Sequence, residues 1–363
     1  MRFDYVVVGA GLCGCVIAER IATQLRKSVL IVERRDHVGG NCHDYFDEAG
    51  VLVHKYGPHY FRTNDVEVWN YLSRFTDWHY VQYRIKASVD GQLLTLPINL
   101  DTFNTLYGTN LSSDQLKEVF ISRGGSVSAI RNSKDAIVSK VGEELYEKFY
   151  KHYTEKQWAV GPEELDASVC ERIPVRTNRD DRYFTDKYQA MPKHGYFRMF
   201  SKMLEDPNIR LLLRTELDLV KDSLQYEKLI YTGPIDAYFG YKHGKLPYRS
   251  LRFEHETLDV EFHQPVSQVN YPNEYDFTRI VEIKHATGQK HPKTTIVREY
   301  PLPEGEPYYP VPAPANHSIY ERYRKDADTL SNVIFLGRLA EYRYYNMDQA
   351  VRRALDIFKS ELA

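Results

Sequence analysis

A glycine-rich turn near the start of the chain has the residue types and the spacing of a dinucleotide site. Gly9, Gly11 and Gly14 form a GxGxxG pattern that also holds Leu12, directly after an apolar run and at the start of a helical pattern. The free N–H groups and the dipole of such a helix favour a pyrophosphate. Glu33 stands 22 residues after Gly11, where its carboxylate can bind a ribose 2′-OH and would repel a 2′-phosphate. Together these residues predict a dinucleotide site.

Two later segments carry further groups suited to binding. The segment RRDHVGGN (34–41) ends in Gly40 and Asn41, whose backbone could lie along a cofactor, and this favours FAD over a loosely held nicotinamide. The segment HKYGPHYFRTN (54–64) is dense in hydrogen-bonding rings. Within it, His59 follows a glycine that permits close approach of the backbone, so a structural and a functional role for His59 are both open.

Tyrosine is unusually frequent, and it gathers near the end of the chain. The chain has 29 tyrosines against 16 phenylalanines and 3 tryptophans, and GRLAEYRYYNM (337–347) holds three of them with two arginines. A ring with a polar tip suits a binding surface as well as half-buried packing. For most of the tyrosines packing is the simpler interpretation, and the cluster at 337–347 is the candidate for binding.

The elements that position the first glycine turn follow from the apolar pattern. Residues 6–8 and 29–32 are apolar runs rich in β-branched residues, as in parallel strands covered on both faces. Residues 15–25 between them have a helical apolar period. The pattern predicts a βαβ unit with the GxGxxG turn at the start of its helix.

The rest of the chain predicts two further lobes inserted into the nucleotide-binding domain. Residues 80–97 alternate as strands with a hairpin turn at 90–91, and residues 101–158 have helical periods. The polar stretch between CERIPVR and MPKHGYF is expected to be functional or mobile. Residues 245–300 predict further strands, and the segment that begins NVIFLG predicts a last strand, a loop and an amphipathic helix.

Charge and cysteine content exclude several classes of partner. With 48 Lys+Arg against 50 Asp+Glu the formal charge is -2, so no basic field recruits nucleic acid or an anionic membrane surface. No segment approaches the ~20 apolar residues of a membrane span, so no membrane insertion is expected. The cysteines (Cys13, Cys15, Cys42, Cys170) lack the spacing of a metal or redox site and the density of a disulfide scaffold. We expect reduced thiols, no metal and a cytoplasmic protein.

Several segments in a fixed order resemble bacterial UDP-galactopyranose mutase over nearly the whole length: HKYGPHYFRTN, YTEKQW, RIPVR, YTGPID, EPYYPV and GRLAEYRYYNM. They are far more specific than GxGxxG. The resemblance implies an α/β fold, usually dimeric, in which an FAD-binding Rossmann-like domain carries an inserted helical bundle and an antiparallel β-sheet domain. The expected bounds are 1–75, 197–240 and 315–363 for the discontinuous FAD-binding domain, 98–165 for the bundle, and 76–97, 166–196 and 241–314 for the substrate domain.

The implied activity is an isomerisation. Such an enzyme interconverts the six- and five-membered ring forms of a nucleotide-activated galactose without net redox change, and the galactofuranose enters polysaccharide biosynthesis. Noncovalent FAD is active in its reduced form: its N5 attacks the anomeric carbon as the nucleoside diphosphate leaves, and the flavin-sugar iminium lets the ring open and reclose. The protein supplies orientation and electrostatics. A reductant such as NAD(P)H or a reductase would prime the flavin.

The resemblance also assigns residues to the substrate. The departing diphosphate would meet the catalytic arginines Arg172 in RIPVR and Arg279 in FTRI, because a guanidinium pairs with phosphate oxygens and stays charged. Phenols from Tyr183, Tyr309 and Tyr345 would donate to the same oxygens, and Tyr344 is assigned to core packing. The nucleobase would meet Phe149, Tyr153, Thr154 and Trp158, of which the first two are four apart and share a helical face.

For the cofactor, the combined motif and resemblance give Gly9, Gly11, Leu12, Gly14, Glu33, Arg34, Gly40, Asn41, His59, Tyr60, Arg338, Asp348 and Gln349.

Two departures from the family pattern bear on the sugar. Arg62 stands where the family has a histidine, and Tyr83 stands where it has an asparagine near the ligand. Arg62 is a long cationic donor that could meet a carbonyl such as an N-acetyl group at C2. UDP-galactose, UDP-N-acetylgalactosamine and a 6-deoxy sugar on a thymidine carrier such as dTDP-fucose are therefore open, as is neutral drift at a tolerant position.

Two other functional classes stay open beside the mutase. A conventional FAD oxidase or dehydrogenase would share the cofactor fold, but it would need a hydride donor held against N5 instead of arginines for a diphosphate. A nucleotide-sugar binding protein without chemistry would keep the cavity and lose turnover. Turnover only with reduced flavin would indicate the mutase, and consumption of oxygen would indicate an oxidase. Binding without conversion would indicate the binding protein.

Overall fold

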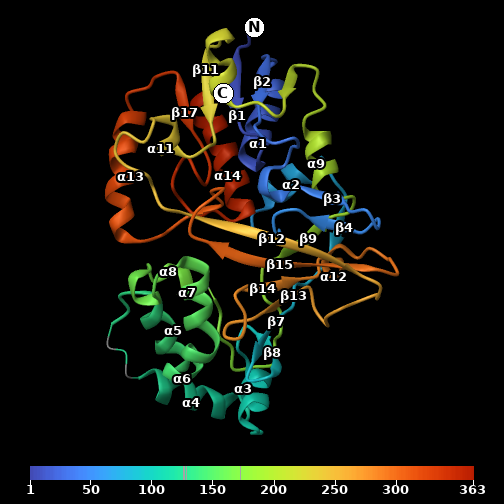
Figure 1. Ribbon diagram of the computed structural model, residues 1–363, viewed down its shortest axis with the longest axis vertical. Coiled ribbons are helices and arrows are strands. Elements are labelled where there is room, and N and C mark those ends of the chain that lie inside the picture. Colours follow the sequence, from blue (N-terminus) through green and yellow to red (C-terminus); the bar gives the residue numbers. More distant parts are fainter. Residues whose placement is uncertain (126, 128, 172) are drawn as a thin grey trace.

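The structure is a computed structural model that describes residues 1–125, 127, 129–171 and 173–363. In Figure 1 the parallel sheet and both chain ends lie at the top, the long strands β12 (Tyr248–Leu258) and β15 (Thr294–Leu302) cross the middle, and a group of helices lies at the bottom. Each of these layers contains segments that are far apart in the sequence.

The parallel sheet has five strands within the described residues, in the order β10-β2-β1-β11-β17. Their bounds are β1 Tyr5–Val8, β2 Val29–Val32, β10 Ile209–Leu212, β11 Lys228–Tyr231 and β17 Val333–Phe335. Helix α1 (Leu12–Arg20), extended by a π-helical turn at Ile21–Leu25, connects β1 to β2, which lie in parallel register. The predicted βαβ unit is therefore confirmed.

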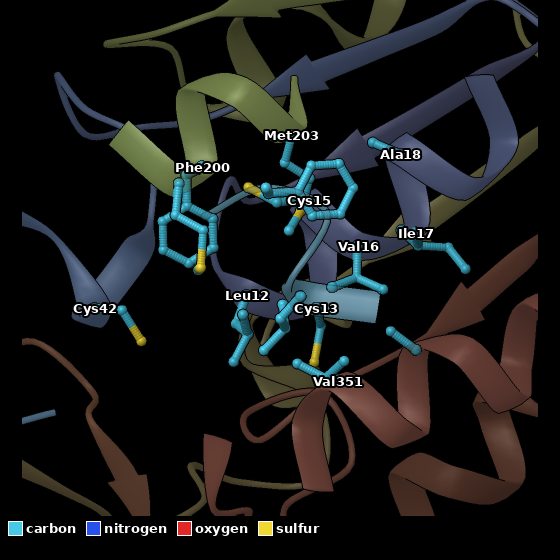
Figure 2. Packing of buried hydrophobic residues seen from close by; sticks show 14 of the residues in the cluster. Leu12, Cys13, Cys15, Val16, Ile17, Ala18, Cys42, Phe200, Met203 and Val351 are labelled. Atoms are coloured by element: carbon cyan, nitrogen blue, oxygen red, sulfur yellow. The ribbon is translucent and has the colours of Figure 1, made fainter. Parts of the chain in front are cut away.

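Helix α1 is buried between two helices from distant parts of the chain (Figure 2). Phe200 and Met203 of α9 (Tyr196–Met203) lie on one side of it, and Val351 of α14 (Met347–Ile357) lies on the other. These residues belong to the largest apolar cluster of the protein, which also holds Val7 and Ile31 from the sheet. Burial of this cluster holds the glycine turn at the edge of the sheet.

Close packing explains why the glycine turn needs glycine. A Cβ on Gly14 would lie 2.0 Å from the carbonyl oxygen of Gly9, and Gly9 itself has φ +101°. Any side chain at Gly14 would therefore push α1 away from β1. The helix N-terminus faces the space above the carboxyl ends of the strands as a result.

The second large sheet has seven strands in the described chain, in the order β16-β12-β15-β14-β13-β7-β8. The bounds not yet given are β7 Ile85–Val89, β8 Gln92–Leu96, β13 Gln268–Asn270, β14 Arg279–Val281 and β16 Tyr309–Pro310. The predicted hairpin is present, with Asp90 and Gly91 both at positive φ between β7 and β8. The expected antiparallel sheet has one exception, because β13 and β7 pair in parallel. No tight turn joins these two strands, so none dictates their direction.

The helical lobe lies between β8 and β9 in the chain. Its helices are α3 Leu100–Tyr107, α4 Ser113–Gly124, α5 Ser133–Val141, α6 Glu143–Tyr146, α7 His152–Trp158 and α8 Ser168–Glu171, with a π-helical turn at Glu147–Lys151. Asn99, Ser112 and Asn132 cap α3, α4 and α5 through their side chains. Its core includes Ile85 and Leu94 of the sheet and Tyr308, so the lobe packs directly on the second sheet.

The remaining elements connect these layers. They are β3 Asp44–Phe46 and β4 Leu52–His54, the sheet β5 Phe61–Thr63, β9 Tyr188–Pro192 and β6 Trp78–Tyr80, and the helices α2 Val66–Leu72, α10 Leu217–Val220, α11 Ile235–Tyr238, α12 Lys284–Thr287 and α13 Pro314–Ala327. Together the layers confirm the predicted fold class, a Rossmann-like α/β domain with helical and antiparallel parts.

The described part of the chain was also searched for membrane-spanning helices, disulfides and metal-binding groups. None of its helices is long and apolar enough to cross a bilayer. Cys13, Cys15 and Cys42 are buried free thiols, and Cys170 is also buried. No group of three or more His, Cys, Asp and Glu side chains there is arranged to hold a metal ion.

Candidate active site

A first cavity of about 640 Å³ opens above the glycine turn, at the carboxyl ends of β1, β2 and β11. Such a crevice at the strand ends is where open α/β sheets bind ligands. The predicted residues that line it are Gly9, Gly11, Leu12, Gly14, Glu33, Arg34, Gly40, Asn41, His59, Arg338 and Tyr345.

The acidic residue of this cavity is held in place by the backbone. Glu33 is 6% exposed, and its two carboxylate oxygens accept the N–H groups of Ala10 at 2.7 Å and Arg35 at 2.8 Å. A carboxylate has about four lone-pair sites, so acceptor capacity remains for a ligand hydroxyl. Ribose hydroxyls are the ligand groups that fit such a position.

The two glycine turns meet across the cavity. A Cβ on Gly40 would lie 2.8 Å from Cα of Gly11, and Gly39 and Gly40 both have positive φ. The backbone at this point is therefore bare and close to any ligand in the cavity. Together with the exposed helix N-terminus, this cradle fits the pyrophosphate of a dinucleotide.

A second cavity of about 600 Å³ lies between the helical lobe, the seven-stranded sheet and the first cavity. The two cavities adjoin, because Asn41, His59, Tyr308, Arg338, Asn346 and Met347 line both. The predicted residues on the second cavity are Arg62, Phe149, Tyr153, Thr154, Trp158, Tyr183, Arg279 and Tyr309. Segments far apart in the sequence therefore converge at one place, whereas Arg172 lies outside the described residues.

Arg279 is a half-buried cation on the second cavity. It lies on β14 directly opposite Glu299 of β15, and its Nη2 is 2.5 Å from Glu299 Oε1. Burial by itself would lower the pKa of Arg279, but the charge of Glu299 raises it well above its ordinary value, so the guanidinium stays charged. Its Nε is buried without a hydrogen-bond partner among the described residues, which leaves a donor for a ligand.

Aromatic side chains surround this charge. Phe149, Thr154 and Trp158 are almost fully buried, and Trp158 packs edge to face on Tyr309 at 5.3 Å between ring centroids. The Tyr309 hydroxyl accepts a hydrogen bond from Gln157, and burial raises its pKa above the ordinary value. A protonated phenol beside Arg279 is a suitable donor to an anion.

Arg62 is paired in this structure. Its Nη1 lies 3.0 Å from both carboxylate oxygens of Asp186, and its guanidinium carbon is 4.1 Å from the ring centroid of Phe184. All three residues line the second cavity. The sequence predicted a cation at this position but gave no sign of the carboxylate that accompanies it.

Two tyrosines predicted to meet the substrate do not line the second cavity. Tyr83 is 1% exposed, and its hydroxyl donates to the carbonyls of Phe61 and Ala190, because the β5 and β9 backbone encloses it. Tyr345 lines only the first cavity. Tyr344, assigned to core packing, is instead 36% exposed and lines the second cavity, and Tyr342 takes the core role at 5% exposure.

Three residues predicted to meet the cofactor lie elsewhere. Asp348 and Gln349 line neither cavity, because α14 turns Met347 and Ala350 toward the first one. Gln349 accepts the N–H of Asn346 in a capping box, which explains its exposed position. Tyr60 lines the second cavity only, and its hydroxyl donates to Ser267 at 3.0 Å.

Sequence reasoning missed several residues that the fold brings to the cavities. Gly305, Glu306 and Pro307 lie on the first cavity from the loop after β15, where Glu306 contacts Arg34 and lies 2.8 Å from Arg35. Glu299 and Asp186 reach the second cavity from distant strands and loops. Glu306 opens the EPYYPV segment, but the sequence assigned it no role, and Glu299 and Asp186 stand in none of the quoted segments. For these carboxylates the available signal was the need of a partly buried arginine for a counter-charge.

Comparisons with known proteins agree with this geometry. The family model of UDP-galactopyranose mutase matches residues 148–344, and a model of the NAD(P)-binding Rossmann-like domain matches residues 7–75. A probable UDP-galactopyranose mutase of Klebsiella pneumoniae is 39% identical over 370 aligned residues, which cover 99% of this chain and 96% of that protein. This chain belongs to the UDP-galactopyranose mutase family. Members of this family are isomerases, so the predicted resemblance and enzyme class are confirmed.

One relative is named for a different nucleotide sugar. A dTDP-fucopyranose mutase of Escherichia coli is 36% identical to this mutase-family chain and covers 97% of it, with 96% of that protein aligned. The crystal structure of a reduced UDP-galactopyranose mutase superposes with a TM-score of 0.79 at 17% identity, over 100% of this chain and 95% of that chain. That likeness supports the shared fold. The family name implies a nucleotide-sugar substrate.

Proposed function

We propose that this protein interconverts the pyranose and furanose forms of UDP-galactose, with reduced FAD in the first cavity and the nucleotide sugar in the second. The observation that carries the proposal is the junction of the two cavities, with a charged, half-satisfied Arg279 on the substrate side. Reduced FAD, when bound, supplies the nucleophilic N5 for the anomeric carbon. The remaining work falls to the side chains of this chain.

The first cavity would hold the cofactor through its backbone and one acid. The bare turns at Gly11 and Gly40 and the helix N-terminus receive the pyrophosphate, and Glu33 accepts from a ribose hydroxyl. At the other end, Arg338 donates to the carbonyls of Tyr345 at 2.7 Å and Tyr308 at 3.3 Å. These bonds fix the wall that the two cavities share.

The second cavity would stabilise the leaving diphosphate. Arg279 is oriented by Glu299 and stays charged, while Tyr309 and Tyr344 present phenols around it, with their ring centroids 6.2 Å apart. Charge that develops on the leaving oxygen in a dry cavity is stabilised most by donors already in place. We assign Arg172 as the second arginine, on the resemblance of RIPVR alone.

The nucleobase would lie against the helical lobe. Phe149, Tyr153, Thr154 and Trp158 line the same side of the second cavity, and the aromatic members offer flat apolar surface for a pyrimidine. A base held there would leave the diphosphate to reach Arg279 and the sugar to reach the junction with the first cavity.

The Arg62–Asp186 pair favours a second candidate for the sugar. An amide group has one acceptor and one donor, and the pair presents a cationic donor and an anionic acceptor 3.0 Å apart on the cavity surface. UDP-N-acetylgalactosamine would satisfy both. The dTDP-fucopyranose mutase relative supports dTDP-fucose as a further substrate.

The test is a substrate panel with controlled flavin oxidation. Purified protein is incubated with UDP-galactopyranose, UDP-N-acetylgalactosamine and dTDP-fucopyranose, in dithionite and separately in air, and ring forms are separated by chromatography. We expect conversion only with reduced flavin. Oxygen consumption would indicate a conventional oxidoreductase instead, and bound flavin without any conversion would contradict the mutase.

Arg62→His tests the sorting role of the pair. We expect the variant to shift relative rates toward plain galactose, because a shorter, less often charged donor reaches an acetamido carbonyl poorly. Equal relative rates before and after the change would remove Arg62 from substrate selection.

The remaining assignments concern the location of the enzyme, its oligomeric state, its reductant and the use of its product. We propose a cytoplasmic homodimer whose flavin is primed by NAD(P)H or by a reductase, and whose product feeds polysaccharide synthesis. Light scattering of the purified protein and anaerobic reduction of its flavin with NADPH test the first two points.

A further inference from the structure

The second cavity lies between two walls that come from different parts of the fold. One wall is the turn at Glu147–Lys151 and helix α7, which carry Phe149 and Trp158. The other is the hairpin β13–β14, which carries Asn270 and Arg279. A ligand that touches both walls needs their spacing to be set before it binds, because ordering two walls at the moment of binding costs affinity.

Lys156 connects the two walls. It lies on α7 within the YTEKQW motif, and its Nζ donates to the backbone carbonyls of Tyr271 at 2.5 Å, Tyr275 at 2.8 Å and Phe277 at 3.2 Å. An ammonium has three donors, and three carbonyls of one turn receive them. Within the described chain no carboxylate forms a salt bridge with Lys156, so its direct partners are backbone carbonyls.

The turn at 271–277, which accepts the hydrogen bonds of Lys156, is packed by its own aromatic rings. Tyr275 stacks on Phe277 with ring centroids 4.7 Å apart, and Tyr271 packs edge to face on Phe277 at 5.2 Å. The three residues of this aromatic cluster are the same three whose carbonyls accept from Lys156. Asn270 precedes the turn and Arg279 follows it, both within two residues of a carbonyl that Lys156 holds.

Weaker contacts reinforce the same junction. His152 Nδ1 donates to Asn273 Oδ1 at 2.9 Å, and Asn273 Nδ2 donates to the carbonyl of Lys148 at 3.1 Å. From the opposite side, Arg249 of β12 donates to the carbonyls of Gln157 at 2.9 Å and Lys156 at 3.2 Å, at the end of α7. Helix α7 is thus held to the sheet at both its side and its end.

We propose that Lys156 is a positioning residue that sets the spacing between the nucleobase wall and Arg279. This inference rests on the proposed function, because it takes the second cavity as the site of a nucleotide sugar. Lys156 does not touch the ligand. Its removal should weaken nucleotide binding and leave the first cavity intact.

The charge of Lys156 gives the proposal a signature that simple packing lacks. Burial lowers the pKa of Lys156 to about 8, and the charges of Glu274 and Asp276 on the same turn partly oppose this shift. On the helix side, the titratable His152 contacts this turn through Asn273, and the ammonium of Lys148 pairs with Asp90. As pH rises through about 8 the ammonium loses a donor, and a lone pair then faces the carbonyls. Nucleotide affinity should fall over the same range.

The experiment measures UDP binding by calorimetry for the FAD-loaded wild type, Lys156→Met and a control, Lys151→Met. Lys151 lies on the neighbouring turn and contacts only the exposed Glu147 at 3.9 Å in the described chain. We expect the dissociation constant of Lys156→Met to rise ~10-fold or more at pH 7, because a charge-assisted set of hydrogen bonds is lost. Lys151→Met should stay within ~2-fold of wild type, as an exposed pair contributes little. FAD content should be the same in all three.

The pH dependence supplies the second measurement. Wild-type affinity for UDP should fall between pH 7 and pH 8.5, below the range in which the uracil of UDP itself ionises, and that of Lys156→Met should be flat over this range. Lys156→Gln, which keeps one or two donors but no charge, should bind with intermediate affinity and also show no alkaline loss. This milder variant carries the test if the methionine variant fails to fold.

Different failures have different meanings. If the wild type binds no UDP at pH 7, the proposed function itself is wrong. If the wild type binds UDP and both Lys156 variants bind it equally well, or keep the alkaline loss of affinity, only the role of Lys156 is overturned. Kinetics give an independent check, since a positioning residue for binding should raise KM by more than it lowers kcat.

Discussion

The two cavities of this protein are built in different ways. Around its glycine turns the first cavity is formed mainly by backbone, from residues 8–14 and 32–42, and more distant segments complete its lining. The second is formed by side chains drawn from β5, α7, β14, β16 and the loops around residues 183–186 and 344. The first therefore depends on the absence of side chains at a few positions, and the second depends on distant side chains meeting.

The charged side chains of the two cavities also have different kinds of partner. Glu33 is satisfied by backbone N–H groups, from Ala10 of the glycine turn, 23 residues away, and from Arg35. In the second cavity, Arg279 and Arg62 are paired with carboxylates 20 and 124 residues away in sequence. Such pairs fix the direction of a guanidinium more than they stabilise the fold, because desolvation offsets much of their attraction. Four predictions test this contrast, from the largest effect to the smallest.

Arg279→Ala should nearly abolish turnover and leave FAD binding unchanged. Leaving-group stabilisation in a dry site commonly contributes ~3 kcal/mol or more, so the rate should fall by at least ~100-fold. The measurements are anaerobic turnover of UDP-galactopyranose and the flavin absorbance of the purified protein. Arg298→Ala is a matched control, because Arg298 lies on the adjacent strand β15 and pairs with the exposed Glu256. A normal rate in Arg279→Ala would show that the second cavity does not depend on this cation.

Gly11→Ala should separate folding from cofactor binding in the first cavity. A Cβ on Gly11 would lie no closer than 4.0 Å to Gly40, and its φ of -76° suits alanine, so the chain should fold normally. The added methyl group would occupy space beside the pyrophosphate, and FAD affinity should fall ~10-fold or more. Gly14→Ala is the contrast, because its Cβ would meet the Gly9 carbonyl and destabilise the domain itself. Thermal unfolding and flavin titration distinguish the two. Unchanged FAD affinity in Gly11→Ala would place the cofactor elsewhere.

Two buried histidines near the junction between the cavities should make the free energy of unfolding fall in acid. Burial lowers the pKa of His54 to about 3 and that of His59 to about 4, below the ordinary 6.5. The unfolded chain takes up protons below pH 6.5 and the folded chain does not, so this stability is present above pH 6.5 and is lost as pH falls. At pH 5, His54 alone should cost the folded state about 2 kcal/mol.

His54→Asn tests this dependence. Asparagine can keep an acceptor for the N–H of His59, which now donates to His54 Nδ1 at 3.2 Å. We expect the variant to lose less of its melting temperature than wild type between pH 7.5 and pH 5. Parallel curves for the two proteins would mean that His54 is not the group that titrates.

Glu306→Gln should loosen the cover of the first cavity slightly. Glu306 reaches Arg34 and Arg35 from the sheet domain, so this one side of the first cavity depends on a long-range contact. Its side chain is 32% exposed and solvent screens the pair, so FAD should dissociate only ~2- to 5-fold faster. Flavin fluorescence on dilution measures the rate, and Glu304→Gln on the same loop is the control. Identical rates in wild type and Glu306→Gln would show that the contact does not retain the cofactor.

Prediction from sequence succeeded where neighbours in the chain are neighbours in space. The strands around the glycine turn, the acid at position 33 and the hairpin at Asp90 were all set by local pattern. The aromatic residues on α7 and the turn before it were named through a resemblance, since their helical spacing alone favours core packing.

Prediction failed where a turn decides which side chain faces a cavity. Tyr342 has φ +44°, and this left-handed residue reverses the chain inside the arginine and tyrosine cluster. Tyr344 is thereby directed to the second cavity and Tyr345 to the first, the opposite of what the sequence suggested for Tyr344. Similarly, nothing in the sequence around Tyr83 shows that strands β5 and β9 enclose it.

The sequence by itself determined the part of the first cavity around the glycine turns, because steric limits at glycines and the pattern of two adjacent strands act over short stretches of chain. Only the tertiary structure decided the second, because the pairing of Arg279 with Glu299, of Arg62 with Asp186 and of Lys156 with the turn at 271–277 depends on strands and helices that meet after folding. A short-range pattern can specify backbone shape, but the counter-charge of a buried cation can come from anywhere in the chain.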